Sequence, residues 1–409
     1  MRIFFSVGEP SGDLHGANLI RRMKAEMPDA QYVGYGGPKM AEAGCEVHYD
    51  LTQHAIMFIW DAIKQLRFFF GLVDRADEYF AENQIEAVVL IDYPGFNWWI
   101  AKKAKRRGIP VFYYGVPQMW AWAPWRVRKI RKYVDHVLCK LPFEVEWFKQ
   151  RNCHATYVGH PYFDQLERQS YDALFLNSMK TEDLVTLLPG SRDREVKNNF
   201  PTLIAAVEIV AQECPEAKFA VACFNQRQKE MAESILEEVR QSRVAEAPKL
   251  PEIQMYEGRT PELMVAAQAC VACSGSVSME LLHHRKPTVI IYKVKRWIMA
   301  AQGILMRTKF ITLVNLIAAT DIRKKTWGPF DPERYPNDAI MPEYMTTGDA
   351  SQLVANHVVG WLNDEERRNE KVAQLDAVAN QYAIPGATSR AADYIIGKLL
   401  KSSSVSKAA

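Results

Sequence analysis

The sequence predicts an α/β protein of two doubly wound domains that face each other across a cleft. Short apolar runs alternate with helix-length segments along the chain, a pattern typical of parallel sheets with crossover helices. The alternation restarts after a polar stretch from Glu167 to Asp183, which indicates a second unit of the same kind. The chain has 409 residues, more than one hydrophobic core usually supports. We therefore predict a first domain over 1–168 and a second over 169–385.

The predicted strands are apolar runs that end in Gly, Pro, Asp or Asn. In the first domain they are RIFFSV (2–7), AQYVGYGG (30–37), AVVLID (87–92), PVFYYGV (110–116), HVLCKL (136–141) and ATYVGH (155–160). In the second they are LVTLLPGS (184–191), KFAVACFN (218–225), IQMYEG (253–258), ACVACSGS (269–276) and TVIIYKV (288–294). Residues 386–409 predict a helix, able to cross back to the first domain and capped by Thr388 or Ser389, and then a disordered tail.

Composition places the chain among ordinary globular proteins, with 48% hydrophobic and 24% charged residues. A net charge of +3 is too small to specify a partner. Cys270 and Cys273 form a C-x-x-C pair without a second ligand pair nearby, so we interpret them as buried apolar residues in a reducing compartment. No apolar run reaches the ~20 residues of a spanning helix, and no signal peptide is visible. We expect a cytoplasmic protein.

Polar side chains follow the predicted strands, where parallel sheets carry their working residues. After the first strand, the turn from Gly8 to Asp13 holds Glu9, Ser11 and Asp13, with His15 close behind. Ser11 or Asp13 can cap the following helix, which leaves Glu9 for the cleft. Asp92 follows another strand and is either a structural turn former or a general base that deprotonates a hydroxyl.

The second domain has two turns that suit a nucleotide. Ser191 and Arg192 precede a helix whose backbone N–H groups can bind an anion, and the Arg192 guanidinium can hold a diphosphate. The turn Ser274-Gly275-Ser276 opens another helix, and Glu280, one turn further on, can accept hydrogen bonds from a ribose. In the alternative interpretation, Ser276 is an ordinary cap and Glu280 a solvated helix residue.

Three common classes of site lack their motifs. The first turn has no G-x-G-x-x-G, and the chain has no G-x-x-x-x-G-K-[ST], which argues against a dehydrogenase and a P-loop enzyme. No H-E-x-x-H suggests a metal, and adjacent His283 and His284 diverge on a helix. We predict neither a cofactor nor a metal.

Seven motifs together carry a family resemblance. GEPSGDLHGA, IDYPGFN, PQMWAW, LPFE, VGHP, LLPGSR and SGSVSMEL, in this order over about residues 1–320, resemble the lipid-A-disaccharide synthases of glycosyltransferase family 19. The resemblance implies the two-domain GT-B fold. It also implies inverting, metal-free transfer of 2,3-diacylglucosamine from its UDP donor to the 6-hydroxyl of 2,3-diacylglucosamine 1-phosphate. The products are the lipid A disaccharide 1-phosphate and UDP.

The resemblance also implies roles for single residues. Asp92 becomes the base, Glu9 shapes the reaction centre, Arg192 contacts the UDP diphosphate and Glu280 holds the ribose. Asn225 and Asn315 match polar positions of the donor domain. Two features depart from the family pattern: Gly95 stands where some relatives carry a second Asp, and residues 324–341 form a longer stretch.

A membrane contact is expected because the implied substrates carry acyl chains. Residues 55–73 form an apolar helical stripe, and we expect an interfacial helix there, unless it is a buried core helix. Its expected membrane residues are Phe58, Trp60, Phe68, Phe69 and Phe70. Basic residues with interspersed Trp between Ala101 and Lys132 fit anionic lipid, or else nucleic acid. The acyl sugar favours lipid at the cytoplasmic face of the inner membrane and no nucleic acid.

Two other functions stay open at this point. One is a GT-B transferase or epimerase that uses UDP-GlcNAc without acyl chains, for which the apolar 55–73 stretch would have no use. The other is a non-catalytic protein that binds a nucleotide sugar or RNA, with a steep salt dependence in the RNA case. Acyl-chain length, acyl-chain number and oligomeric state, including a homo-oligomer, are left undetermined.

Overall fold

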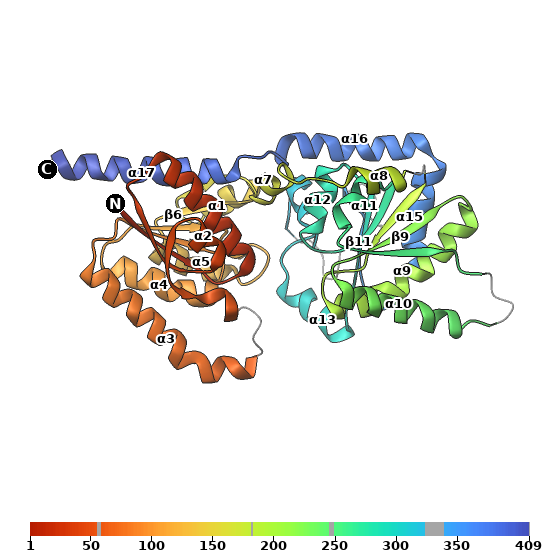
Figure 1. Ribbon diagram of the computed structural model, residues 1–409, viewed down its shortest axis with the longest axis horizontal. Coiled ribbons are helices and arrows are strands. Elements are labelled where there is room, and N and C mark those ends of the chain that lie inside the picture. Colours follow the sequence, from red (N-terminus) through yellow and green to blue (C-terminus); the bar gives the residue numbers. More distant parts are fainter. Residues whose placement is uncertain (55–58, 181–182, 245–248, 324–338, 409) are drawn as a thin grey trace. The chain divides into compact units, whose positions relative to one another are not determined.

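The computed structural model describes residues 1–54, 59–180, 183–244, 249–323 and 339–408 (Figure 1). The chain divides into two compact units. Unit 1 comprises Met1–Asp164 and Ile384–Ala409, and unit 2 comprises Gln165–Ala383. Each unit contains one parallel sheet, as expected from the alternating pattern of the sequence.

The sheet of unit 1 has seven parallel strands in the order β3-β2-β1-β4-β5-β6-β7. The strands are β1 (Arg2–Val7), β2 (Gln31–Gly36), β3 (Cys45–Asp50), β4 (Ala87–Ile91), β5 (Val111–Tyr114), β6 (His136–Cys139) and β7 (Ala155–Tyr157). All six strands predicted for this domain are present. Strand β3 was not predicted because it lies at the edge of the sheet and is half polar, so it lacks the continuous apolar run of a central strand.

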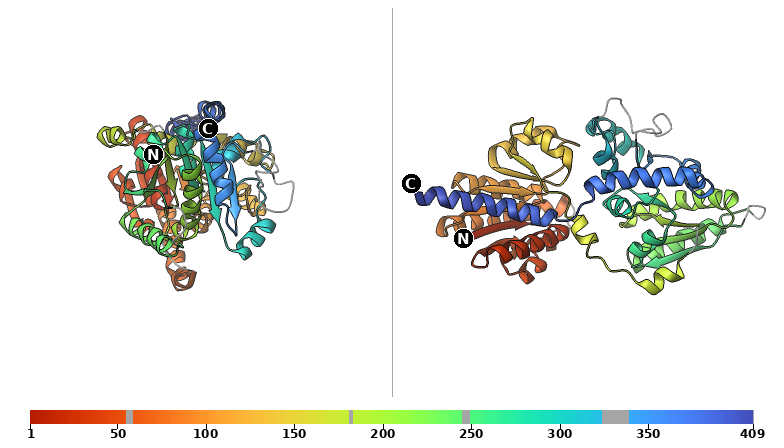
Figure 2. Two further views of the ribbon diagram at one scale, coloured as in Figure 1. Left: turned by 90° about the vertical axis from the view of Figure 1, so that its right-hand side faces the viewer. Right: turned by 90° about the horizontal axis from the view of Figure 1, so that it is seen from above.

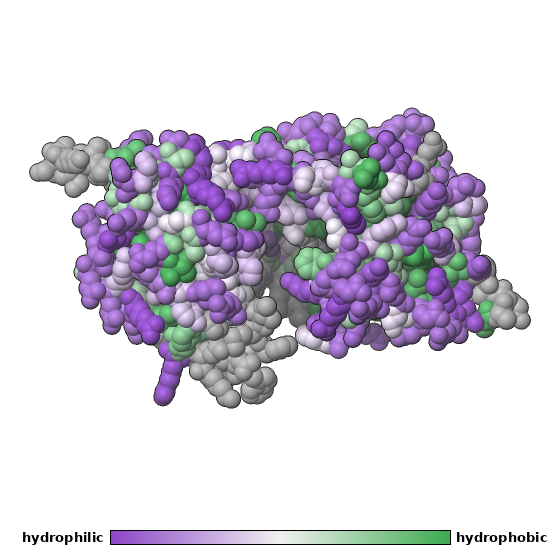
Figure 3. All heavy atoms as spheres, viewed as in Figure 1, coloured by the Kyte–Doolittle hydropathy of each residue, from purple (hydrophilic) through white to green (hydrophobic). Residues whose placement is uncertain are grey.

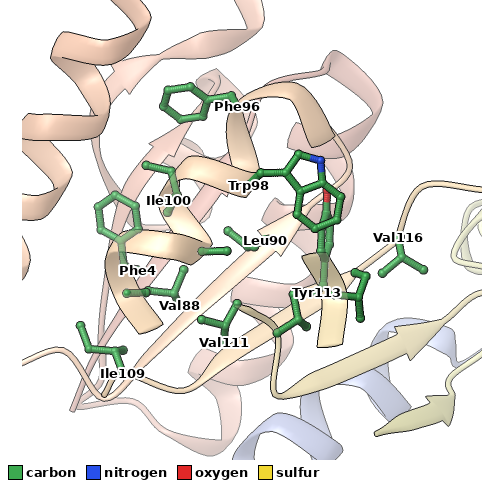
Figure 4. Packing of buried hydrophobic residues seen from close by; sticks show 14 of the residues in the cluster. Phe4, Val88, Leu90, Phe96, Trp98, Ile100, Ile109, Val111, Tyr113 and Val116 are labelled. Carbon is green, nitrogen blue, oxygen red and sulfur yellow. The ribbon is translucent and has the colours of Figure 1, made fainter. Parts of the chain in front are cut away.

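Helices cover both faces of this sheet. They are α1 (Pro10–Glu26), α2 (Pro38–Glu42), α3 (Ile59–Glu82), α4 (Pro94–Arg106), α5 (Val127–Tyr133), α6 (Pro142–Lys149), α7 (Tyr162–Leu166), α17 (Ala387–Ala408) and the 3₁₀ helices η1 (Leu51–His54) and η2 (Pro124–Arg126). Neighbouring residues of β1 point to opposite faces. Phe4 packs with α3 and α4 in one core cluster, seen in Figure 4, and Ile3 and Phe5 pack with α1 and α17 in another.

Helix α17 belongs to unit 1 and runs beside α1 (Figures 1 and 2). The Asp164 carboxylate accepts hydrogen bonds from the backbone N–H groups of Gly386 (2.7 Å), Ala387 (3.0 Å) and Thr388 (2.8 Å). The cap therefore comes from a residue far away in sequence, and not from Thr388 or Ser389. In the structure α17 extends to Ala408 and so includes most of the segment for which a disordered tail was predicted.

The sheet of unit 2 has six parallel strands in the order β10-β9-β8-β11-β12-β13. They are β8 (Leu184–Leu188), β9 (Lys218–Cys223), β10 (Ile253–Glu257), β11 (Ala269–Cys273), β12 (Thr288–Lys293) and β13 (Glu343–Thr346). The five predicted strands are confirmed. Strand β13 was missed because it is a four-residue edge strand with too short an apolar pattern.

Nine helices lie in the described part of unit 2. They are α8 (Ala173–Ser178), α9 (Asp193–Glu213), α10 (Gln226–Gln241), α11 (Thr260–Ala266), α12 (Val277–His283), α13 (Arg296–Leu305), α14 (Leu313–Ala318), α15 (Ser351–Asn363) and α16 (Glu365–Tyr382). Helices α9, α10 and α15 bury their apolar sides against one face of the sheet. Cys270 and Cys273 are buried in β11, and burial raises the pKa of both thiols to about 12, which keeps them protonated.

The surface seen in Figure 3 is mostly hydrophilic on both units, and apolar residues appear there only in small groups. No described helix combines the length and the apolar character needed to cross a bilayer. Most of the longer stretch at 324–341, namely 324–338, lies outside the described residues.

Candidate functional site

Each sheet has a point where the strand order reverses. In unit 1 this point lies between β1 and β4, and in unit 2 it lies between β8 and β11. Connections on the two sides of such a point leave in opposite directions, which opens a crevice beyond the carboxyl ends of the strands. Glu9 and Asp92 follow β1 and β4, and Arg192 and Ser276 lie in the turns after β8 and β11. The topology thus places these predicted site residues where ligands bind in such sheets.

Asp92 sits on a sharp left-handed turn between β4 and α4. Its φ is 45°, and that of Tyr93 is 42°, a region that L residues avoid at a cost of about 1–3 kcal/mol each. Two side chains hold the turn through the Asp92 carbonyl oxygen, which accepts from Asn97 Nδ2 (2.8 Å) and the Tyr113 hydroxyl (2.7 Å). Buried Asn97 also bonds Ser6 Oγ at 2.6 Å, so it ties the ends of β1 and β4 together. The strain is therefore maintained by a specific network around the Asp92 backbone carbonyl.

The turns after β1 and β4 pack directly on each other. A Cβ built on Gly8 would lie 2.3 Å from the Tyr93 ring, so only glycine fits beneath this ring. Gly95, in contrast, has open space: a Cβ there meets no atom within 4 Å. Packing therefore demands glycine at position 8 but leaves room for a side chain at position 95.

Charged and imidazole groups gather around Asp92. Lys140, directly after β6, places Nζ 3.3 Å from Asp92 Oδ1. Burial first, then the negative charge of Asp92, raise the pKa of the Glu9 carboxyl, and Lys140 acts in the opposite direction. Burial and the charge of Lys140 lower the pKa of His15 to about 4 and that of His160 well below its ordinary value. Both histidines are therefore neutral at pH 7, beside two carboxylates and an ammonium.

Of the residues predicted at the first turn, Asp13 has a structural role. Its buried carboxylate accepts from the backbone N–H groups of Gly37 (2.9 Å), Lys39 (3.0 Å) and Met40 (3.1 Å), and so it caps α2 instead of its own helix. Ser11 is exposed on the first turn of α1 and makes no cap, because α1 has no side-chain cap at all. His15 lies one turn deeper, within the electrostatic reach of Lys140 and Asp92.

In unit 2, the structure corrects the expected anion site of free backbone N–H groups. The Glu195 carboxylate accepts from the backbone N–H groups of Ser191 (3.0 Å) and Arg192 (3.2 Å) and thus occupies the start of α9. A glutamate three residues into a helix often does this, and the sequence DREV contained that signal. The Arg192 side chain remains 80% exposed, with one nitrogen 3.2 Å from Glu195, and can reach a diphosphate in solvent.

The other predicted donor residues differ in their surroundings. Ser274 is half-buried, Gly275 and Ser276 are exposed, and Ser276 makes no side-chain cap bond, so it is not the ordinary cap of the alternative interpretation. Glu280 is buried in α12 and not solvated. Asn225 caps α10 by accepting from Gln228 N–H at 3.0 Å.

Asn315 is fully engaged inside unit 2. Its Nδ2 donates to the Met341 carbonyl (2.7 Å) and to Glu343 (2.9 Å), and its Oδ1 accepts from Met341 N–H (2.9 Å). These three bonds use both donors and the acceptor of the amide, in a site that is 1% exposed. The structure therefore gives Asn315 a packing role between α14 and β13 and leaves no donor for a nucleotide.

Sequence reasoning gave no role to three residues that the structure places near Asp92. In the sequence, Asn97 lies in the motif IDYPGFN, His160 ends the predicted strand 155–160, and Lys140 lies within the predicted strand 136–141. The available signal was the position of Lys140: a lysine immediately after an apolar strand lies at the same sheet edge as Asp92. Two further motifs prove to be structural partners, because Trp120 of PQMWAW donates its indole N–H to Glu144 of LPFE at 2.9 Å.

The expected membrane residues are only partly described. Phe58 and the side chain of Trp60 lie outside the described residues. Phe68 and Phe70 are exposed, but Phe69 packs against the core and its ring centroid lies 6.0 Å from that of Phe96. Phe69 is therefore a core residue in part, because its neighbours in α3 point elsewhere around the helix.

A family model described as lipid-A-disaccharide synthetase matches residues 3–330. The chain belongs to this family. Relatives named lipid-A-disaccharide synthase include that of Coxiella burnetii (strain Dugway 5J108-111), 31% identical, with 91% of this chain and 92% of the relative covered. The relative from Syntrophus aciditrophicus (strain SB) is 30% identical, with 98% of both chains covered.

Solved structures show that this family member has the GT-B fold. The S. aureus MnaA–UDP co-structure aligns with a TM-score of 0.59 at 12% identity, over 96% of this chain and 95% of that one. UDP-GlcNAc 2-epimerase from Neisseria meningitidis bound to UDP-GlcNAc gives 0.58 at 12% identity, over 98% of this chain and 100% of that one. At such identities the likeness concerns the fold.

The described residues of this lipid-A-disaccharide synthetase family member contain no cluster of three His, Cys, Asp or Glu side chains that could hold a metal ion.

Proposed function

We propose that the chain transfers 2,3-diacylglucosamine from its UDP donor to the 6-hydroxyl of 2,3-diacylglucosamine 1-phosphate, with Asp92 as the general base. Asp92 takes the hydroxyl proton, the oxygen forms a bond to the anomeric carbon from the face opposite UDP, and the bond to UDP breaks. The observation that carries the base assignment is the strained, multiply bonded turn that holds Asp92 at the switch point of unit 1. Glu9 shapes the same centre from β1.

Unit 2 holds the donor nucleotide in this proposal. Arg192 binds the diphosphate and offsets the charge that develops on UDP as it leaves, so no metal is needed for this purpose. The exposed turn Ser274-Gly275-Ser276 lets the nucleotide approach the backbone closely, and Glu280 accepts from the ribose. Asn315 is left out of this site, since its amide is already fully bonded.

The acyl chains imply work at a membrane surface, and we place the enzyme peripherally on the cytoplasmic face of the inner membrane. Exposed aromatic residues of unit 1 support this location. They are Phe70 and Trp99, whose rings lie against each other, and also Trp122 and Trp125. Cations lie over two of these rings, Lys102 over Trp99 at 5.3 Å and Arg126 over Trp122 at 4.8 Å. Aromatic rings with nearby cations suit the headgroup region of an anionic bilayer.

The experiment incubates the protein with the UDP-diacylglucosamine donor and the diacylglucosamine 1-phosphate acceptor and measures UDP release together with the disaccharide. We expect both products in equal amounts. Loss of a general base typically lowers the rate by ~10²–10⁴, so Asp92→Asn should lose turnover to that extent and still bind UDP. Asp29→Asn, at an exposed position of the same unit, is the matched control.

Two outcomes would contradict the proposal. Near-normal turnover of a folded Asp92→Asn protein would remove the base assignment. Conversion of UDP-GlcNAc into its C2 epimer, without disaccharide formed from the acylated substrates, would favour an epimerase instead.

A further inference from the structure

Lys140 is held against Asp92 by three adjacent strands. Asp92 follows β4, Lys140 follows β6, and Gly115 follows β5 between them. A Cβ on Gly115 would lie 2.9 Å from both Asp92 Oδ1 and Lys140 Nζ, so the backbone of this turn forms a wall against the ion pair. The side chains of Lys140 and Asp92 are 21% and 23% exposed, which leaves one side open to solvent. The side chains of Lys140 and Asp92 therefore have few alternative positions.

The surroundings of this pair are rich in negative charge. The Glu9 carboxylate, in the turn after β1, is repelled by the charge of Asp92 and attracted by the charge of Lys140. The positive charge of Lys140 also acts on the imidazoles of His15 in α1 and His160 after β7, but both imidazoles are neutral at pH 7. Lys140 therefore faces two carboxylates and no charged histidine. The Lys140 ammonium thus reduces the repulsion between the carboxylates of Glu9 and Asp92.

We propose that Lys140 is a positioning residue for the transfer: its ammonium fixes the Asp92 carboxylate in the orientation that accepts the proton of the acceptor hydroxyl. This inference rests on the proposed role of Asp92 as the base. Lys140 acts through Asp92, so its removal should change turnover more than substrate binding.

The fold does not depend on the Lys140 ammonium. Its backbone N–H donates to Glu144 at 3.0 Å, and this bond persists whatever the side chain is. Met retains an unbranched stem of similar length without the charge. Lys140→Met is therefore a variant in which the ion pair is removed while the anchoring of α6 is kept.

The experiment compares Lys140→Met and Lys140→Arg with Lys149→Met, an exposed lysine of α6 in the same unit. For Lys140→Met we expect kcat to fall about 10- to 100-fold, less than for complete loss of the base. KM for donor and acceptor should stay within about threefold of the parent.

Lys140→Arg should recover part of kcat, while Lys149→Met should match the parent in both kcat and KM. A double variant, Asp92→Asn with Lys140→Met, should be no slower than Asp92→Asn alone, because a residue that acts through Asp92 has no effect once the carboxylate is gone.

The outcomes separate this inference from the proposed function. If Asp92→Asn is active, the base assignment fails. If Asp92→Asn loses turnover but Lys140→Met keeps the parent kcat, only the positioning role fails. A raised KM for the acceptor at unchanged kcat would also overturn it, since Lys140 would then bind the acceptor's phosphate and not Asp92.

Discussion

Single residues at the strand ends carry the proposed chemistry, and their surroundings distinguish functional from structural groups. Asp13 lies shortly after β1 and Asp92 directly follows β4, so the sequence made both of them candidate site residues. The structure separates them: Asp13 accepts three backbone N–H bonds, whereas Asp92 faces Lys140 on a strained turn. A carboxylate that already accepts several bonds has little left for a substrate.

Arg192 offers the clearest test of the donor site. Arg192→Ala should weaken UDP binding by about 1.5–3 kcal/mol, the range of a charge-assisted hydrogen bond, which is about 10- to 150-fold in Kd. Arg240→Ala, at the far end of α10 in the same unit, is the control for loss of one positive charge. Titration calorimetry with UDP gives both values. UDP binding by Arg192→Ala that equals the parent's would place the diphosphate elsewhere.

His357 predicts a pH dependence of stability. Burial, with Arg367 and Lys371, lowers the pKa of this imidazole to about 4, and its Nε2 lies 2.8 Å from the Tyr344 hydroxyl. The unfolded chain binds the proton more readily than the folded one below about pH 6.5, so stability is complete above that pH and is lost as pH falls towards about 4. The loss from this one group should reach up to about 2 kcal/mol at pH 5.

Urea unfolding of parent and His357→Gln at pH 7 and pH 5 measures this contribution. We expect the variant to lose less stability than the parent between the two pH values, although it starts from a lower stability. His154→Gln, at an exposed position, should behave as the parent does. Equal pH dependence in parent and His357→Gln would show that this imidazole stays neutral or becomes solvated without cost.

At the scale of elements, buried carboxylates fix helix starts from a distance. Asp13 caps α2 and Asp164 caps α17. Glu343 of β13 accepts from the backbone N–H groups of Ile311 (2.8 Å) and Thr312 (3.0 Å) at the start of α14. Each of these carboxylates satisfies N–H groups that a helix start leaves unpaired. The elements are thus joined by polar contacts as well as by apolar packing.

Removal of the Asp164 carboxylate should release α17 from unit 1. Asp164→Ala leaves three backbone N–H groups without their acceptor, and we expect about 1–3 kcal/mol of lost stability concentrated in α17. Hydrogen exchange should show reduced protection of the segment from Ala391 to Leu399, which packs against α1. Asp172→Ala, which removes the cap of α8 in unit 2, should leave that segment protected. Uniform loss of protection over the whole chain would contradict a local anchor.

For the whole molecule, the surface of unit 1 predicts membrane association. Trp122 and Trp125 are 55% and 62% exposed, so replacing both with Ser should remove apolar contact with lipid and barely change the melting temperature. Sedimentation with anionic vesicles should show weaker binding for this double variant. Raising salt beyond ~0.15 M, where the screening length is ~8 Å, should weaken the part due to basic residues and spare the apolar part.

Phe69→Ser serves as the contrasting variant, because Phe69 packs against the core and its loss should lower the melting temperature. Phe68 and Phe70 are exposed, whereas Phe69 packs against the core, so the three side chains do not form one lipid-facing surface. A double tryptophan variant that sediments as the parent does would remove these side chains from the membrane contact.

Much of this protein could be predicted from local sequence pattern. Eleven apolar runs predicted eleven of the thirteen strands, because a central parallel strand is buried on both faces and must be apolar along its length. The position of Asp92 and Arg192 after such strands then placed both at sheet edges, and the ordered motifs indicated the family. These inferences hold because hydrophobic periodicity and the residue types that end a strand are properties of short stretches of chain.

Only the tertiary structure decided which polar groups are already bonded. The cap of α17 by Asp164, the engagement of Asn315 by Glu343 and the pairing of Lys140 with Asp92 join residues that lie between 28 and 224 positions apart. No local pattern encodes such pairs, because a buried carboxylate or amide takes whichever donor the topology brings within about 3 Å. The sequence by itself therefore determined the fold class and the edges where chemistry can occur, and the packing of distant strands determined which side chains remain free there.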